Sequence, residues 1–169
     1  MMSTDLKELI NELKANENGA AQDRVLLCEI NSQLKNEQTV KHPRFVEAFN
    51  KYTWPHHDAL VKPYNHSQDY LIVQSKRNLL HAWEALQGFL DFDIHKDSED
   101  IHLKHMHLNK LYQLIEKGIF NLVLNTLELS NLKDMLAEYN DENKKLNGQD
   151  PQKIQNDYTN AIVFITSLK

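Results

Sequence analysis

The sequence has few of the residues that interrupt helices or form disulfides. Its 169 residues include four glycines, four prolines and one cysteine. So few helix breakers favour long helices. One cysteine excludes an internal disulfide and a zinc finger built on several cysteines. Cys28 stands in the apolar stretch VLLCEI, so we expect a buried, inert thiol there.

Long apolar runs and an excess of positive charge are also missing. No stretch approaches the roughly 20 apolar residues of a membrane-spanning helix. The first residues, MMSTDLKELINELK, lack the apolar core of a secretory signal. The net charge is −5, which argues against nucleic acid as a partner because such binding needs a cationic face. These absences predict a cytoplasmic protein, with export without a cleaved signal left open.

Helical periodicity runs through the sequence, and no run of strict alternation persists, so we expect no sheet. We predict an all-α, single-domain helical bundle of five to seven helices over residues 1–169, without a cofactor. The expected segments are N-terminal helices at 4–35, a connector rich in proline, histidine and aromatic residues at 41–66, and bundle helices at 67–90, 99–146 and 151–168.

The ends of the later helices have recognisable cap residues. An acidic stretch, DFDIHKDSED, separates the helices 67–90 and 99–146, and we expect Ser98 to be the N-cap of the second. Asn65 or Ser67 can cap the first. Asp150 and Pro151 predict the start of the last helix, because proline suits the first helical position.

A seven-residue apolar repeat marks the predicted helix 99–146. Its members are Ile101, Leu108, Ile115, Leu122, Leu129 and Leu136. Such a repeat predicts coiled-coil-like packing, either within the bundle or between chains. A straight helix of this length would span about 70 Å, more than a compact domain of this size. It therefore either extends and pairs with a partner or folds back near Gly118 or Ser130.

Six residues are candidates for binding a partner protein. Four belong to the repeat and two to the connector: Leu108, Ile115, Leu122, Leu129, Trp54 and Tyr64. Residues 41–81 also hold six basic against three acidic residues, together with six aromatic ones. Aromatic residues and arginine are typical of interface centres, although a helical core uses aromatic residues as well.

The connector stretch TWPHHDALVKPYNH contains the candidates for a metal site. His56, His57, Asp58 and His66 would supply enough imidazole and carboxylate for zinc or iron. Neighbouring histidines, however, point about 100° apart on a helix. We therefore favour the interpretation that this stretch is a connector bounded by prolines, which Trp54 and Tyr64 anchor to the core.

A second group of histidines lies in the stretch DSEDIHLKHMH. Glu99 and His102 form one Glu-x-x-His motif, whereas di-iron bundles need such a motif on two helices. Ferritin-like and hemerythrin-like sites are excluded on this count. We expect His102 and His105 to be surface or boundary residues, and His107, on another face, to add little.

The stretch KRNLLHAW contains two catalytic candidates, Arg77 and His81. Arg77, Asn78 and His81 resemble the Arg-Asn-x-x-x-His motif of HEPN ribonucleases, with a spacing one residue short. The resemblance implies that the arginine and histidine act together on the RNA phosphate and 2′-hydroxyl, usually across a dimer. It does not extend beyond this stretch. Otherwise Arg77 is a surface charge and His81 a boundary residue.

Two classes of function follow from these patterns. The favoured one is a non-catalytic, protein-binding helical bundle: an adaptor, secretion chaperone, inhibitor or immunity protein, or effector that acts by contact. Its partner would be another protein or a second copy in a homodimer. The alternative is a helical-bundle metal-binding protein or a HEPN-like ribonuclease that uses the histidine and arginine residues of the segment 56–81.

Overall fold

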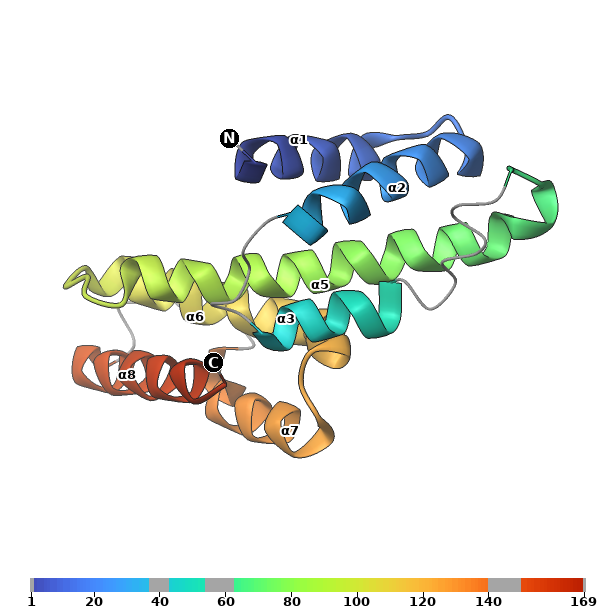
Figure 1. Ribbon diagram of the computed structural model, residues 1–169. Helices are drawn as coiled ribbons and strands as arrows, with labels where there is room; N and C mark the ends of the chain where they lie inside the picture. The colour runs from blue at the N-terminus through green and yellow to red at the C-terminus, as the bar shows by residue number, and fades with distance from the viewer. Residues whose placement is uncertain (1, 37–42, 54–62, 140–149, 169) are drawn as a thin grey trace. The chain divides into compact units, whose positions relative to one another are not determined.

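A computed structural model describes residues 2–36, 43–53, 63–139 and 150–168 of the chain (Figure 1). These residues form seven α-helices and no strand, so the predicted all-α fold is confirmed. The chain divides into two compact units, unit 1 (Met1–Ala82) and unit 2 (Trp83–Lys169). The boundary falls within the longest helix, α5 (Asp69–His95). No helix in the described residues is long and apolar enough to cross a membrane.

Unit 1 contains three further helices besides the first half of α5. They are α1 (Met2–Ala15), α2 (Ala20–Asn36) and α3 (Pro43–Ala48), which a π-helical turn extends over Phe49–Thr53. Helices α1 and α2 pack against each other as an antiparallel hairpin (Figure 1). The two helices together begin and end within two residues of the predicted helical segment 4–35. Gly19, with φ 105°, makes the turn between them.

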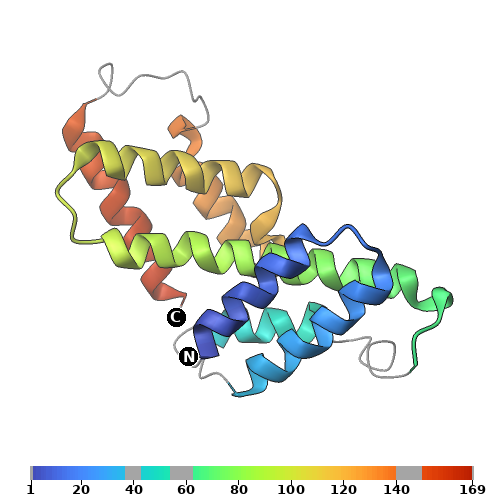
Figure 2. The same cartoon turned by 90° about the horizontal axis from the view of Figure 1, so that it is seen from above.

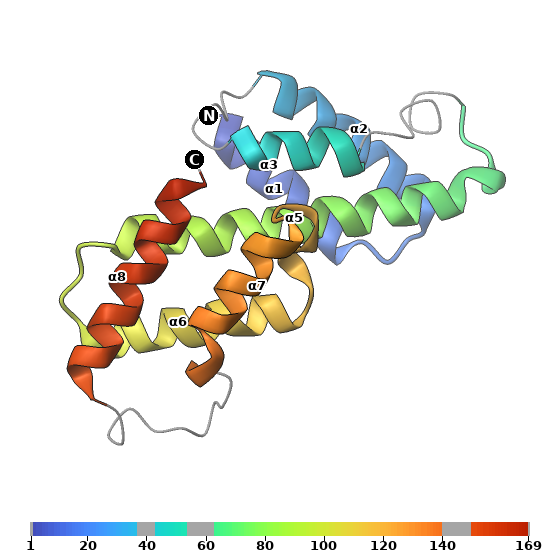
Figure 3. The same ribbon diagram turned by 90° about the horizontal axis from the view of Figure 1, so that it is seen from below.

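The core of unit 1 follows the helical spacing of the sequence. On α1 the buried residues stand three or four apart, so they share one face of the helix. The buried apolar residues of the unit are Leu6, Ile10, Leu13, Leu26, Leu27, Ile30, Phe45, Ala48, Phe49, Ile72, Leu79 and Ala82. They come from all four helices, and α1, α2 and α3 lie along the first half of α5 (Figures 1 and 3).

A capping box precedes α5, at the 3-10 turn His66–Gln68. The Asn65 side chain accepts a hydrogen bond from the Ser67 N–H at 3.0 Å, and the Asn65 N–H donates to Oε1 of Gln68 at 3.1 Å. This arrangement satisfies backbone donors that the start of a helix leaves unpaired. Of the two expected caps, Asn65 is therefore the one used.

Unit 2 consists of the second half of α5 and three helices packed around it. They are α6 (Ile101–Glu116), α7 (Thr126–Met135) and α8 (Pro151–Ser167), with 3-10 turns at Ile119–Leu122 and Ala137–Tyr139. Helix α8 crosses both α6 and the second half of α5 (Figures 2 and 3), and it also packs against α7. The predicted start of α8 is confirmed, with Asp150 as N-cap and Pro151 in the first turn.

Of the two alternatives for the segment 99–146, the structure shows the one that folds back near Gly118, with α6 ending at Glu116 and α7 beginning at Thr126. Gly118 has φ 75°, a left-handed conformation that favours glycine, and it directly follows the C-cap residue Lys117. Asn125 then caps α7 in a capping box with Glu128. Ser130, the other expected break, lies within α7. Residues 140–146 lie outside the described part of the chain.

The predicted loop over residues 91–100 is also partly wrong. Helix α5 continues to His95 because Phe92 is buried and stacks on Tyr158 of α8, with ring centroids 5.1 Å apart. Asp100, not Ser98, is the N-cap of α6, and its side chain accepts from two backbone N–H groups. A carboxylate accepts such bonds more strongly than a hydroxyl does. The Ser98 hydroxyl instead accepts from the Asp100 N–H at 3.2 Å.

Candidate functional site

One side of α5 in unit 1 exposes apolar and cationic side chains together. Tyr70 is 73% exposed and Val73 48% exposed, Arg77 is exposed, and His81 is half-buried. At 3.6 residues per turn, these four positions fall on one side of the helix, opposite the buried Ile72. We call Tyr70, Val73, Arg77 and His81 the α5 stripe.

Arg77 and His81, the catalytic candidates, stand one helical turn apart on this stripe. Their spacing therefore places both on the same face, as the sequence predicted. Neither forms a hydrogen bond or ion pair with another residue of the described part of the chain. The Arg77 guanidinium thus leaves its charge without a carboxylate partner among these residues.

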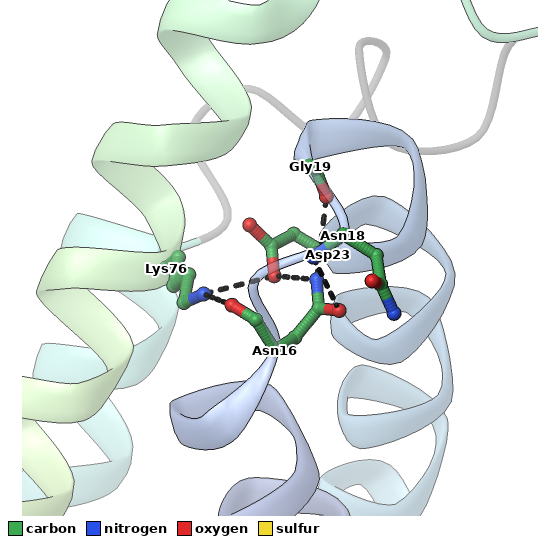
Figure 4. A network of polar contacts seen from close by, with 5 residues as sticks. All are labelled: Asn16, Asn18, Gly19, Asp23 and Lys76. Carbon is green, nitrogen blue, oxygen red and sulfur yellow. Dashed lines mark hydrogen bonds and ion pairs between the residues drawn. The ribbon is translucent and has the colours of Figure 1, made fainter.

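The neighbouring Lys76 points the other way, into a polar network at the turn between α1 and α2 (Figure 4). Its Nζ donates to Oδ1 of Asp23 at 2.9 Å and to the backbone oxygen of Asn16 at 3.2 Å. The Asn16 amide donates to the same Asp23 oxygen at 2.8 Å. Asp23 is 6% exposed, and a buried carboxylate needs such a cation and donors around it. The network therefore fixes the rotation of α5 that leaves Arg77 facing outward.

Tyr64, a partner-binding candidate, is held by the start of α5. Its hydroxyl donates to Oδ1 of Asp69 and lies 3.1 Å from Nδ1 of His66. The hydrogen bond to the Asp69 carboxylate raises the pKa of the Tyr64 phenol, and burial adds to this. This half-buried side chain therefore links the segment before the helix to its first turn.

The metal-site candidates cannot be assembled from the described residues. His66 is exposed and contacts Tyr64 and Asp69, whereas His56, His57, Asp58 and the partner-binding candidate Trp54 lie outside the described residues. In the part that is described, no three histidine, cysteine or acidic side chains come close enough together to hold a metal ion.

The leucines and isoleucines of the heptad repeat mainly serve the core of unit 2. Leu108 and Ile115 are fully buried, while Leu122 and Leu129 are half-buried. Asn109 donates to the backbone oxygen of Tyr139 at 3.0 Å, which holds the returning chain against α6. The burial of the first two candidates follows from packing within one chain, so their spacing does not require a second chain.

The interior of unit 2 also contains a cluster of polar and aromatic side chains. His107 is 7% exposed, and its ring stacks on that of His95 with centroids 4.8 Å apart. The Phe92 ring lies 6.1 Å from the His107 ring and stacks on Tyr158. Lys104, 4% exposed, has its Nζ 5.6 Å from the centre of the Tyr158 ring. We call His95, Lys104, His107 and Tyr158 the His107 cluster.

Hydrogen bonding within the His107 cluster is incomplete. Lys104 donates to the side-chain oxygen of Gln155 on α8. Nε2 of His107 and the hydroxyl of Tyr158, in contrast, are buried without a hydrogen-bond partner in the described structure. Each such group carries a desolvation cost, so the cluster is held in place by ring packing more than by polar contacts.

The surroundings of His107 and Tyr158 favour the uncharged forms of these two rings. Burial lowers the pKa of His107, the neighbouring His95 lowers it further, and Asp91 opposes both. Burial also raises the pKa of Tyr158 to about 12, with a smaller contribution from Asp91. A neutral imidazole and a protonated phenol suit an apolar core.

Cys28 is half-buried, so the expectation of a fully buried thiol is only partly met. Burial raises the pKa of this thiol, and the cation of Arg24 lowers it by less. The reactive form of cysteine is the thiolate. The thiol form therefore prevails near neutral pH, in keeping with the predicted lack of reactivity.

Sequence reasoning missed the polar residues that the structure places in the two interiors. His107 was given little weight, although Leu103 and Leu111 stand four residues to either side and place it on an apolar row. Asp23 and Lys76 offered no local signal, because 53 residues separate them. No family model, curated protein or solved structure matches this chain.

Proposed function

We propose that this chain acts by contact with another protein, without catalysis of its own, and that the α5 stripe makes the contact. The exposure of Tyr70 and Val73 beside Arg77 carries the proposal. Tyrosine and arginine are enriched among the residues that contribute most to binding energy. An exposed tyrosine also brings a large contact area at a small entropic cost, because it has two rotatable bonds.

The charge of the stripe indicates the chemistry of the partner. Arg77 forms no ion pair with the described residues, whereas the adjacent Lys76 is paired with Asp23. A carboxylate on the partner would form an ion pair with Arg77. The Arg77 guanidinium can bind such a carboxylate through two parallel hydrogen bonds. The partner surface we propose is therefore an apolar segment that carries at least one acidic side chain.

The experiment is photo-crosslinking from the stripe in cells that naturally make the protein. A photoreactive phenylalanine derivative replaces Tyr70 in the full chain. The control replaces Val25, which is 43% exposed on α2 of the same unit. We expect a light-dependent adduct with one other protein from position 70 and none from position 25. The purified partner should then bind Arg77→Glu about tenfold more weakly than the unchanged chain.

Four outcomes would overturn this proposal. Equal adducts from positions 70 and 25 would mean that the stripe is not specific. Adducts that join two copies of this chain would make the occupant a second copy. Absence of any adduct, or unchanged partner binding by Arg77→Glu, would remove the stripe as the contact surface.

The alternative, a HEPN-like ribonuclease, would use Arg77 and His81 of the same stripe. Its supporting observation is that both residues stand one turn apart on one face. If the purified chain cleaves RNA, and His81→Ala abolishes cleavage without lowering the melting temperature, the contact-only function is wrong. If His81→Ala mainly lowers the melting temperature, His81 has a structural role.

A further inference from the structure

The groups that face His107 do not stabilise a positive charge on its ring. Helix α5 presents His95 and Asp91, and α6 itself presents Lys110. Helix α8 presents Tyr158 across the ring of Phe92, and Nζ of Lys104 lies 5.6 Å from the centre of that Tyr158 ring. The Asp91 carboxylate could balance a charge on His107, but it already pairs with Nζ of Lys110 at 2.9 Å. The remaining neighbours are cations, an imidazole or neutral rings.

Protonation would also create a buried donor without an acceptor. An imidazolium carries a proton on both ring nitrogens. One of them, Nε2 of His107, is buried and has no hydrogen-bond partner in the described structure. Stacking on His95 at 4.8 Å would further place the new charge against a second imidazole, which offers no negative charge to balance it.

From this geometry we propose that His107 makes unit 2 an acid-sensitive switch. The free-energy cost of protonating His107 falls when α6 separates from the second half of α5, because the imidazolium then reaches water. Acidification therefore favours the open form. Opening would bring His107 into water and uncover Phe92 and Tyr158, which are buried in the closed form. This device lies in unit 2 and does not depend on the partner proposed for the α5 stripe.

The lowered pKa of His107 gives the direction and the pH window of the effect. Above the ordinary value of 6.5, the imidazole is neutral in the open and closed forms, and the closed form keeps its full stability. As the pH falls below 6.5, the open form takes up the proton while the closed form does not. The stability of the closed form therefore falls as the pH drops from 6.5 to the lowered pKa that His107 has in the closed form. Below that pKa, His107 causes no further loss of stability.

Hydrogen exchange of the full chain tests the proposal, with mass spectrometry resolving the helices. Exchange is compared between about pH 7.5 and about pH 5 and corrected for the intrinsic effect of pH. We expect protection of α6 to fall severalfold, while that of α1 and α2 in the same chain stays within about twofold. In His107→Leu, which cannot take up the proton, the fall in α6 should disappear.

A matched control lies two residues away on the same helix. His105 is half-buried and packs edge-on against Tyr139, and burial together with His102 lowers its pKa too. His105→Gln should therefore leave most of the acid response in place. If His105→Gln removes the response and His107→Leu does not, the proposal is wrong.

The protein without substitutions tests the proposed switch even if His107→Leu does not fold. Protection of α6 that stays constant with pH overturns the proposal. A second measurement follows the ring resonances of His107 by nuclear magnetic resonance. Titration of His107 clearly below the ordinary histidine pKa, at the same pH at which α6 loses protection, supports the switch. Titration at or above 6.5 overturns it.

Discussion

Unit 1 buries a carboxylate beside a cation, whereas unit 2 buries a lysine, an imidazole and a phenol in one cluster of side chains. In unit 1, the Asp23 carboxylate accepts hydrogen bonds from Nζ of Lys76 and from the side-chain amide of Asn16. In unit 2, Nε2 of His107 has no such partner among the described residues. A buried charge must be paired, but a neutral ring can be tolerated at a smaller cost. The first arrangement makes the packing specific, and the second makes it dependent on protonation.

The two units also differ in net charge. Residues 1–82 contain ten basic and ten acidic residues, whereas residues 83–169 contain nine and fourteen. The whole net charge of −5 therefore lies in unit 2. Acidification reduces the repulsion among these carboxylates, so an acid-induced opening of unit 2 would have to come from groups such as His107 that gain charge.

The largest effect is expected where the buried pair of unit 1 is broken. Asp23→Ala should lower the free energy of unfolding by about 3 kcal/mol, because it leaves Lys76 and Asn16 without their common acceptor. Denaturant unfolding measures this loss. The matched variant is Lys110→Ala in unit 2, whose exposed pair with Asp91 has the same 2.9 Å length. Its expected cost is below about 1 kcal/mol, and equal losses would contradict the comparison.

An intermediate effect is expected for two tyrosines of unit 2, one whose hydroxyl has a hydrogen-bond partner and one whose hydroxyl has none in the described structure. The Tyr139 hydroxyl donates to Oδ2 of Asp157 at 2.6 Å, whereas the Tyr158 hydroxyl is buried without a partner in the described structure. Tyr139→Phe should cost about 1.5 kcal/mol in unfolding free energy, and Tyr158→Phe should cost nothing or stabilise by up to about 1 kcal/mol. Thermal unfolding of the two variants compares them directly. A destabilised Tyr158→Phe would show that this hydroxyl has a partner after all.

The smallest difference is expected between the two glycines that have positive φ in the described residues, one in each unit. A Cβ at Gly118 would lie 3.1 Å from Nδ2 of Asn121, whereas one at Gly19 would meet nothing within 4 Å. Gly118→Ala should destabilise by about 1 to 2 kcal/mol, because a left-handed conformation is strained for alanine. Gly19→Ala has no such contact, but its φ of 105° lies further from the left-handed region open to alanine, so it should lose at least as much through the backbone alone. Denaturant midpoints of the two variants give the difference, and a clearly smaller loss in Gly19→Ala would contradict it.

Local signals predicted the helices well because caps and periodicity act over a few residues. Asp150 followed by Pro151 predicted the start of α8 correctly, and Gly118 was recognised as one possible break. The heptad repeat could not decide between a straight and a folded helix, because both arrangements bury the same row of residues. Ser98 was preferred to Asp100 as a cap, although both types cap well, so composition alone could not choose between them.

The arrangement of the candidate sites depended on contacts that a sequence pattern does not contain. Nothing local distinguishes Lys76, which reaches Asp23, from Arg77, which faces outward. Their roles follow from the rotation of α5 in its core. Similarly, His107 and His102 look alike in sequence, but the first is buried and the second is exposed. Weighting each histidine by the apolar residues three and four positions away would have separated them.

The bond between Lys76 and Asp23 also has a consequence for the order of folding. The α1–α2 hairpin closes a short loop, since Asn16 and Asp23 are seven residues apart, whereas the bond from Lys76 closes a loop of 53 residues. Loop closure costs entropy that rises with length, so long-range contacts tend to form later. The hairpin can therefore form before α5 packs against it. Refolding rates should then be affected more by substitutions within the hairpin than by substitution of Lys76, whose bond would act mainly by slowing unfolding.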